Sequence, residues 1–139
     1  MKTKWLVALL CICVLGCSSG GPAVVPIEGT VTHTGEPVPN LRIYFAPTGG
    51  RPSWAVSDST GHFKLDYDPD HTGALVGMHK VFVVDEGGIV DETAAMSGGA
   101  RPKRSPAMAE IVKKYGKKET SPLEVEVKKA DRNFQLKLD

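Results

Sequence analysis

Residues 123–128 read LEVEVK, and residues 134–139 read FQLKLD. In both stretches an apolar side chain is followed by a polar one, and the pattern repeats every two residues. Successive side chains of a β-strand point to opposite faces, so this alternation is typical of a strand with one buried face and one face in water. The two stretches predict the last two strands of a sheet protein, joined by a turn at residues 130–132.

Shorter pieces of the same alternation predict five earlier strands, at residues 24–33, 41–46, 54–56, 63–67 and 79–84. Stretches rich in glycine and proline separate them, as expected for turns. The last of the five is apolar on both faces, which indicates a central place in a sheet. Seven short strands at fairly regular spacing predict an all-β fold, a two-sheet sandwich of immunoglobulin-like or transthyretin-like form.

One short helix is expected before the last two strands. Ser105 is suited to cap its start, Pro106 to occupy its first turn, and Gly116 to end it. Its apolar residues recur at helical spacing: Met108, Ile111, Val112 and Tyr115. The preceding residues 85–104 show no periodicity, which is typical of a functional or a disordered loop.

The N-terminal residues have the pattern of a secretory signal. Lys2 and Lys4 precede eleven uncharged residues, 5–15, and the small residue Gly16 follows. A membrane-spanning helix needs about 20 apolar residues, so an uncut transmembrane anchor is the weaker alternative. Residues 1–16 are therefore expected to be a signal peptide that is removed.

The residue after that cut is a cysteine, and residues 14–17, VLGC, resemble the lipobox of bacterial lipoproteins. The resemblance implies that Cys17 is the lipid attachment site and the new N-terminus. It also implies a membrane lipid-anchored, extracytoplasmic protein, on the periplasmic face or at the outer membrane. Residues 17–26 would be a flexible tether and residues 27–139 the domain. The alternative is a plain secretory signal with Cys17 as an ordinary thiol.

Cysteine content and charge limit the remaining possibilities. Cys11 and Cys13 lie in the segment to be removed, and lipid would occupy the sulfur of Cys17, so no disulfide is expected. Of the 17 Lys and Arg residues, 15 remain after removal of Lys2 and Lys4, against 16 Asp and Glu. A near-neutral chain gives no indication of nucleic-acid binding.

Three short motifs share an order and spacing with a known family. Residues 29–31 read GTV, residues 35–40 read GEPVPN, and residues 58–63 read DSTGHF. They resemble the carboxypeptidase regulatory-like domain, a transthyretin-like β-sandwich, and residues 114–127 look like the closing region of short lipoproteins that carry this domain alone. The resemblance implies a non-catalytic structural, adhesive or interaction module.

No pattern of catalytic or metal-binding residues supports an enzyme. Transthyretin-like hydrolases end in Tyr-Arg-Gly-Ser, whereas this sequence has FQLKLD at residues 134–139. The histidines lack the short spacings of zinc ligands: His33, His62, His71 and His79. Asp66, Asp68 and Asp70 alternate as calcium ligands do, but without the glycine and glutamate of a calcium loop. We therefore expect no catalytic residue, no cofactor and no bound metal.

The lipid on Cys17 would make the membrane one partner of this protein. Two groups of residues indicate what else it could bind. Trp54 and Tyr44, if exposed, would favour a carbohydrate-binding module, and burial of both would exclude it. Residues 101–118 hold seven Lys and Arg against Glu110. This basic segment is either a site for anionic lipid or acidic polysaccharide, or a solvated loop and helix end. An envelope protein or a polysaccharide is therefore the expected partner.

Overall fold

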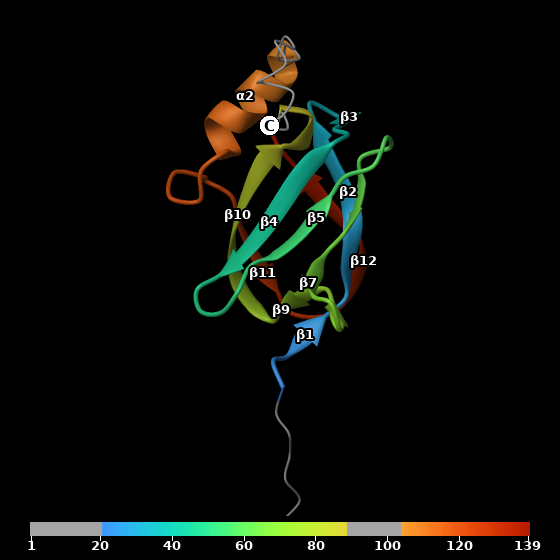
Figure 1. Cartoon of the computed structure of the whole chain (residues 1–139), viewed down its shortest axis with the longest axis vertical. Coiled ribbons are helices and arrows are strands. Elements are labelled where there is room, and N and C mark those ends of the chain that lie inside the picture. Colours follow the sequence, from blue (N-terminus) through green and yellow to red (C-terminus); the bar gives the residue numbers. More distant parts are fainter. Residues whose placement is uncertain (1–20, 89–103) are drawn as a thin grey trace, which may run out of the picture.

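The computed structural model describes residues 21–88 and 104–139, and within them strands dominate. Two main sheets face each other, and one α-helix lies across an end of the sandwich (Figure 1). The all-β prediction with one helix is confirmed. The predicted signal peptide, Cys17 and most of residues 85–104 lie outside the described residues.

The larger sheet has six antiparallel strands in the order β11-β10-β4-β5-β7-β8. Its strands are β4 (Leu41–Pro47), β5 (Ser53–Val56), β7 (Asp66–Asp68), β8 (His71–Thr72), β10 (Gly77–Asp85) and β11 (Glu124–Val127). Strand β10 lies between β4 and β11, so the interior place expected for residues 79–84 is confirmed.

The smaller sheet is built around one strand. Its members are β2 (Ile27–His33), β3 (Glu36–Pro37), β6 (His62–Lys64) and β12 (Asp131–Lys137). Strand β2 pairs antiparallel with β3 and β6, and parallel with β12. The last strand of the chain thus returns beside the first long one, although about a hundred residues separate them in sequence.

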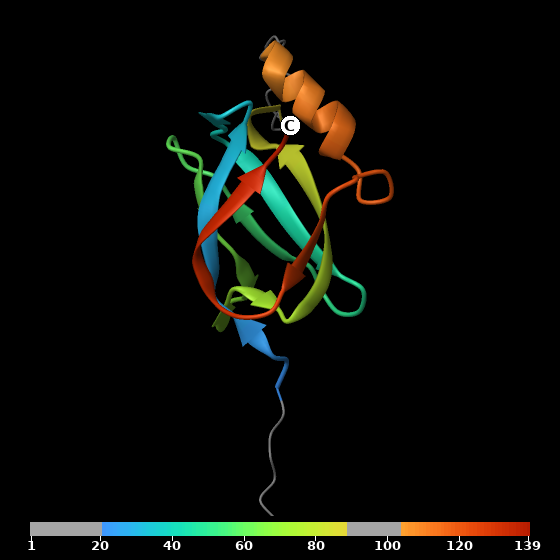
Figure 2. The same cartoon turned by 180° about the vertical axis from the view of Figure 1, so that it is seen from behind.

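A third, two-stranded ladder joins β1 (Val24–Val25) to β9 (Ala74–Leu75) at the end of the sandwich where the chain enters (Figures 1 and 2). Val24 and Val25 fall within both the expected tether, 17–26, and the expected first strand, 24–33, and the structure shows them as paired backbone. Gly73 fits here because a Cβ on it would meet the Val25 carbonyl oxygen at 2.0 Å. The folded part therefore includes residues before position 27.

The strand count differs from the prediction, because the described residues contain twelve strands rather than seven. Residues 63–67 were expected to form one strand, yet Phe63 pairs with Gly29 in the smaller sheet and Asp66 with Trp54 in the larger. The chain changes sheet at the buried Leu65, whose N–H donates to the Ile27 carbonyl at 3.0 Å. The other additional strands are two-residue pairings that no periodicity can reveal.

The turn expected at residues 130–132 is also displaced. Strand β11 ends at Val127 and β12 already begins at Asp131, so the connection is residues 128–130. The two strands lie in different sheets, and Asp131 is held by its N–H, which donates to the Pro26 carbonyl at 2.9 Å.

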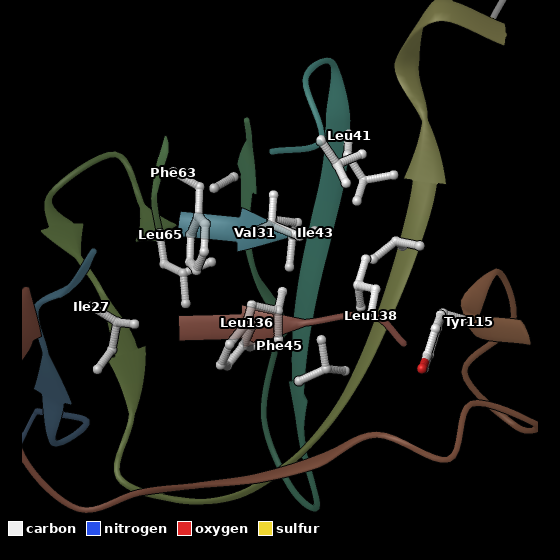
Figure 3. Packing of buried hydrophobic residues seen from close by; sticks show 14 of the residues in the cluster. Ile27, Val31, Leu41, Ile43, Phe45, Phe63, Leu65, Tyr115, Leu136 and Leu138 are labelled. Atoms are coloured by element: carbon white, nitrogen blue, oxygen red, sulfur yellow. The ribbon is translucent and has the colours of Figure 1, made fainter. Parts of the chain in front are cut away.

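The core lies between the inner faces of the two sheets (Figure 3). Phe45 of β4 meets Phe134 of β12 edge to face, with 5.9 Å between ring centroids. The largest fully buried apolar side chains are Phe45, Phe63, Leu41, Ile43, Leu65, Ile111, Leu136 and Leu138. Burying each such side chain contributes about 1.5–3 kcal/mol, so this packing is the main source of stability.

Helix α2 (Pro106–Tyr115) confirms the predicted helix. Ser105 caps it, because its side chain accepts the N–H of Met108 at 3.2 Å, while Ile111 and Tyr115 are buried against the sandwich. Gly116 ends it for an unexpected reason. Its φ is −75°, and a Cβ there would meet the Val112 carbonyl oxygen at 2.2 Å, so close approach rather than a left-handed turn requires glycine.

Gly29→Ala should destabilise the protein, because a Cβ on Gly29 would lie 2.0 Å from the Phe134 carbonyl oxygen of the neighbouring parallel strand. Forcing β2 and β12 apart should lower the free energy of unfolding by about 1–3 kcal/mol in urea titration. The matched control is Gly49→Ala, where a Cβ meets nothing within 4 Å. Equal stability of the two variants would contradict the close approach.

Candidate functional site

A row of large side chains crosses the outer face of the six-stranded sheet. The register places Phe82 beside Tyr44, Tyr44 beside Trp54, and Trp54 beside Asp66. Tyr44 and Phe82 are half-buried and stacked, with ring centroids 4.7 Å apart and planes 8° apart. Trp54 is 40% exposed. We call Phe82, Tyr44 and Trp54 the aromatic row.

Arg42 borders the aromatic row on the side of Val56. Its guanidinium carbon lies 5.0 Å from the centre of the Trp54 ring, and its Nε pairs with the Glu86 carboxylate. A hydrogen bond with Tyr44 raises the pKa of Arg42, burial acts against it, and the charge of Glu86 raises it further. The cation is thus held over one face of the indole ring.

Trp54 also forms part of the wall of a hollow of about 380 Å³, which is lined by Arg51, Asp66, Asp68 and Pro69 as well. Two carboxylates and a guanidinium beside an exposed indole give both acceptors and donors next to an apolar ring face. This is the combination that recognises a molecule with apolar faces and polar edges. The sequence singled out Trp54, and it singled out Asp66 and Asp68 as possible calcium ligands, but it did not indicate that they lie together with Arg51.

Of the aspartates considered as calcium ligands, Asp66 pairs with Trp54 in the sheet, and Asp68 and Asp70 belong to the turn that follows β7. The Oδ1 atom of Asp68 accepts the backbone N–H of Asp70 at 2.9 Å and that of His71 at 2.8 Å, and it lies 2.8 Å from Nδ1 of His71. Burial tends to raise the pKa of Asp68, but these hydrogen bonds outweigh it and the pKa is lowered. Within residues 21–88 and 104–139, no three possible metal ligands of the His, Cys, Asp or Glu type lie together.

The four histidines are dispersed over the described structure. His33 contacts the Leu138 carbonyl through Nδ1 and lies 3.8 Å from Glu110, and His62 is exposed on β6. His71 belongs to the Asp68 turn. His79 is buried, with Nε2 2.7 Å from the Leu75 carbonyl oxygen.

A second concavity, of about 460 Å³, lies at the end of the sandwich beside the start of α2. Its wall is formed by His33, Pro37, Asn40, Asp85, Arg104 and Met108, from three segments that are distant in sequence. Such a cleft leaves no local sequence signal. Asp85 and Arg104, the two ends of the expected loop, are joined by an ion pair of 2.8 Å.

Of the cations of the basic segment 101–118 that the structure describes, four lie in or just after the last turn of α2, and Arg104 lies apart from them: Lys113, Lys114, Lys117 and Lys118. Arg104 precedes α2 and is paired with Asp85, while Lys114 lies in the last turn and contacts the main-chain oxygen of Asp139. Ten helical residues separate these ends by about 15 Å. Arg101 and Lys103 lie outside the described residues. Binding of anions by this segment remains a prediction.

Comparison with known proteins adds no assignment, since no family model, no curated protein and no solved structure matches the chain. None of the helices in the described ranges is long and apolar enough to cross a membrane.

Asp68→Asn should reduce stability at neutral pH and have little effect in acid. The lowered pKa of folded Asp68 means that its contribution is complete above the ordinary value of 3.8 and is lost as the pH falls through the folded-state pKa. Urea titrations from neutral pH into acid should therefore show that the free energies of unfolding of the wild type and the variant converge below pH 3.8. Asp70→Asn is the control, because it makes the same chemical change at a neighbouring aspartate. A stability difference between the wild type and Asp68→Asn that persists at low pH would contradict a stabilising role of the ionised Asp68.

Proposed function

We propose that this protein is a lipid-anchored, extracytoplasmic β-sandwich with a non-catalytic binding role at the cell envelope. The signal pattern of residues 1–16 and the VLGC motif ending at Cys17 support the anchor. The β1 strand begins at Val24, so few residues separate the proposed lipid from the fold. The short distance favours a protein that works beside its membrane.

We further propose the immunoglobulin-like or transthyretin-like type of sandwich, of the carboxypeptidase regulatory-like kind. The hairpin motif at residues 58–63 supports it. Asp58 accepts the N–H groups of Thr60 at 2.8 Å and His62 at 3.0 Å, and Gly61 has a φ of +75°. Both features are what the D-x-x-G-x-F turn requires.

The observation that supports a binding role best is the exposed Trp54 at the end of the aromatic row. Trp54 is 40% exposed and lies beside a hollow with charged edges, and aromatic side chains in such places are enriched at recognition surfaces. The stacked rings of Tyr44 and Phe82 join β4 to β10 on the same face, next to the β5 strand that carries Trp54.

The alternative within this role is a carbohydrate-binding module, and the hollow beside Trp54 favours it. Sugars offer an apolar ring face to stack and hydroxyl groups to hydrogen-bond. The indole ring meets the first need, and Asp66, Asp68 and Arg51 meet the second. Tyr44 is half-buried, so we assign stacking to Trp54 and a supporting role to Tyr44.

Trp54→Ala should weaken binding of the purified protein to envelope polysaccharide by roughly three- to tenfold, the loss expected for one aromatic stacking contact. Pull-down with peptidoglycan sacculi and titration with soluble oligosaccharides would measure it. Trp54→Phe is the matched control, because it keeps an aromatic face and should retain most of the affinity. Saturable binding that Trp54→Ala leaves unchanged would exclude this surface.

A further inference from the structure

Two apolar side chains stand out at the start of β10, where the chain leaves β9. Val76 and Met78 are each 47% exposed, more than any other large hydrophobic residue in the described part of the chain. They flank Gly77, whose φ of +133° suits glycine and sets the bend into the strand. Neither residue contributes to the core cluster. Their exposure therefore needs a reason other than folding.

These residues lie at the end of the sandwich where the N-terminal segment enters. The N–H of Val76 donates to the Ala23 carbonyl at 2.9 Å, and Val24 pairs with Leu75. A shallow hollow of about 200 Å³ lies at this end, and its lining includes Ala23, Pro47, Thr48, Leu75, Val76 and Met78. Helix α2 is at the opposite end (Figures 1 and 2).

The distance to the proposed lipid is short. Ala23 follows Cys17 by six positions, and a fully extended chain of six residues spans at most about 20–22 Å. A lipid on Cys17 would therefore keep this end of the sandwich within about 22 Å of the bilayer surface.

The charge at this end fits the same surface. Gly77 pairs with Val127, so Lys128 and Lys129 follow at the edge beside Val76, and both are exposed. Glu126, the register partner of Met78, lies 2.9 Å from Lys128 and offsets its charge, so the cation that this end offers to an anionic surface is the exposed Lys129. Basic side chains next to apolar ones are typical of contacts with the anionic headgroups of a membrane.

We infer that Val76, Met78, residues 47–49 and the turn 128–130 form a membrane-contact surface, here called the base, whose partner is a lipid bilayer with anionic headgroups. The inference rests on the proposed anchoring at Cys17. It also predicts how the sandwich is oriented on the membrane. Strand β10 runs from the base over nine residues, about 30 Å, to Asp85 at the other end. The cleft beside α2 therefore faces away from the bilayer.

Spin labels on the lipid-modified protein would test this orientation. Val76→Cys and Met78→Cys change exposed positions, and the mature chain has no other free thiol if Cys17 carries lipid. The control is Val56→Cys, 39% exposed on β5 and paired with Arg42 towards the far end. Each nitroxide is measured in vesicles of phosphatidylethanolamine and phosphatidylglycerol, with oxygen and a water-soluble nickel chelate as relaxing agents.

We expect the ratio of oxygen to nickel accessibility to be at least about threefold higher at positions 76 and 78 than at position 56, because oxygen concentrates in the acyl boundary and the chelate does not. Flotation of the same sample with the vesicles reports anchoring separately. A sample that floats but has water-exposed labels at all three positions overturns the base and leaves the anchor intact. A sample that fails to float overturns both.

One further outcome separates lipid from protein. Labels at positions 76 and 78 that remain in water on pure lipid vesicles but are shielded in native membranes would assign the base to an envelope protein. That result would overturn the bilayer contact.

Discussion

The parallel pairing of β12 with β2 is the contact on which the rest of the structure depends. Gly29 and Phe134 face each other so closely that no side chain fits at position 29, and Leu136 then follows beside Val31 within the core. This pairing joins residues about a hundred positions apart, so forming it costs the entropy of closing a long loop. The apolar layer between the sheets repays that cost.

The same pairing organises both ends of the sandwich. At one end Asp131 is bonded to Pro26, next to β1 and the entering chain. At the other end β12 leads to Leu138 and Asp139, whose main-chain oxygen accepts the Tyr115 hydroxyl at 2.6 Å and so fixes α2. The molecule therefore has an end tied to the N-terminal segment and an end closed by the helix. The proposed anchor gives these two ends different surroundings, membrane and solvent.

The sequence predicted what depends on near neighbours. Period-two alternation located the long strands, and Ser105 and Pro106 located the start of α2. It did not predict the change of sheet at Leu65 or the two-residue ladder of β1 with β9, because pairing partners are chosen by tertiary packing. The reason for glycine at position 116 was likewise invisible, since it lies in a contact with Val112 rather than in a turn.

The candidate site was predictable only in part, for the same reason. Trp54 and Tyr44 stood out as aromatic residues on strands, but their exposure depends on which face of the sheet the core selects. Asp66 and Asp68 join Trp54 only because β5 pairs with β7. The cleft beside α2 combines residues as distant as Asn40 and Met108, and no local motif encodes it.

The central claim is that a lipid holds this sandwich at a membrane through the residue that precedes its short entry segment. Intact-mass measurement of the mature protein, extracted from membranes of native cells, tests it most directly. The account predicts a chain that begins at Cys17 and carries the added mass of a diacylglyceryl group on the sulfur. A chain that retains Met1, or one with an unmodified Cys17 thiol, would contradict it.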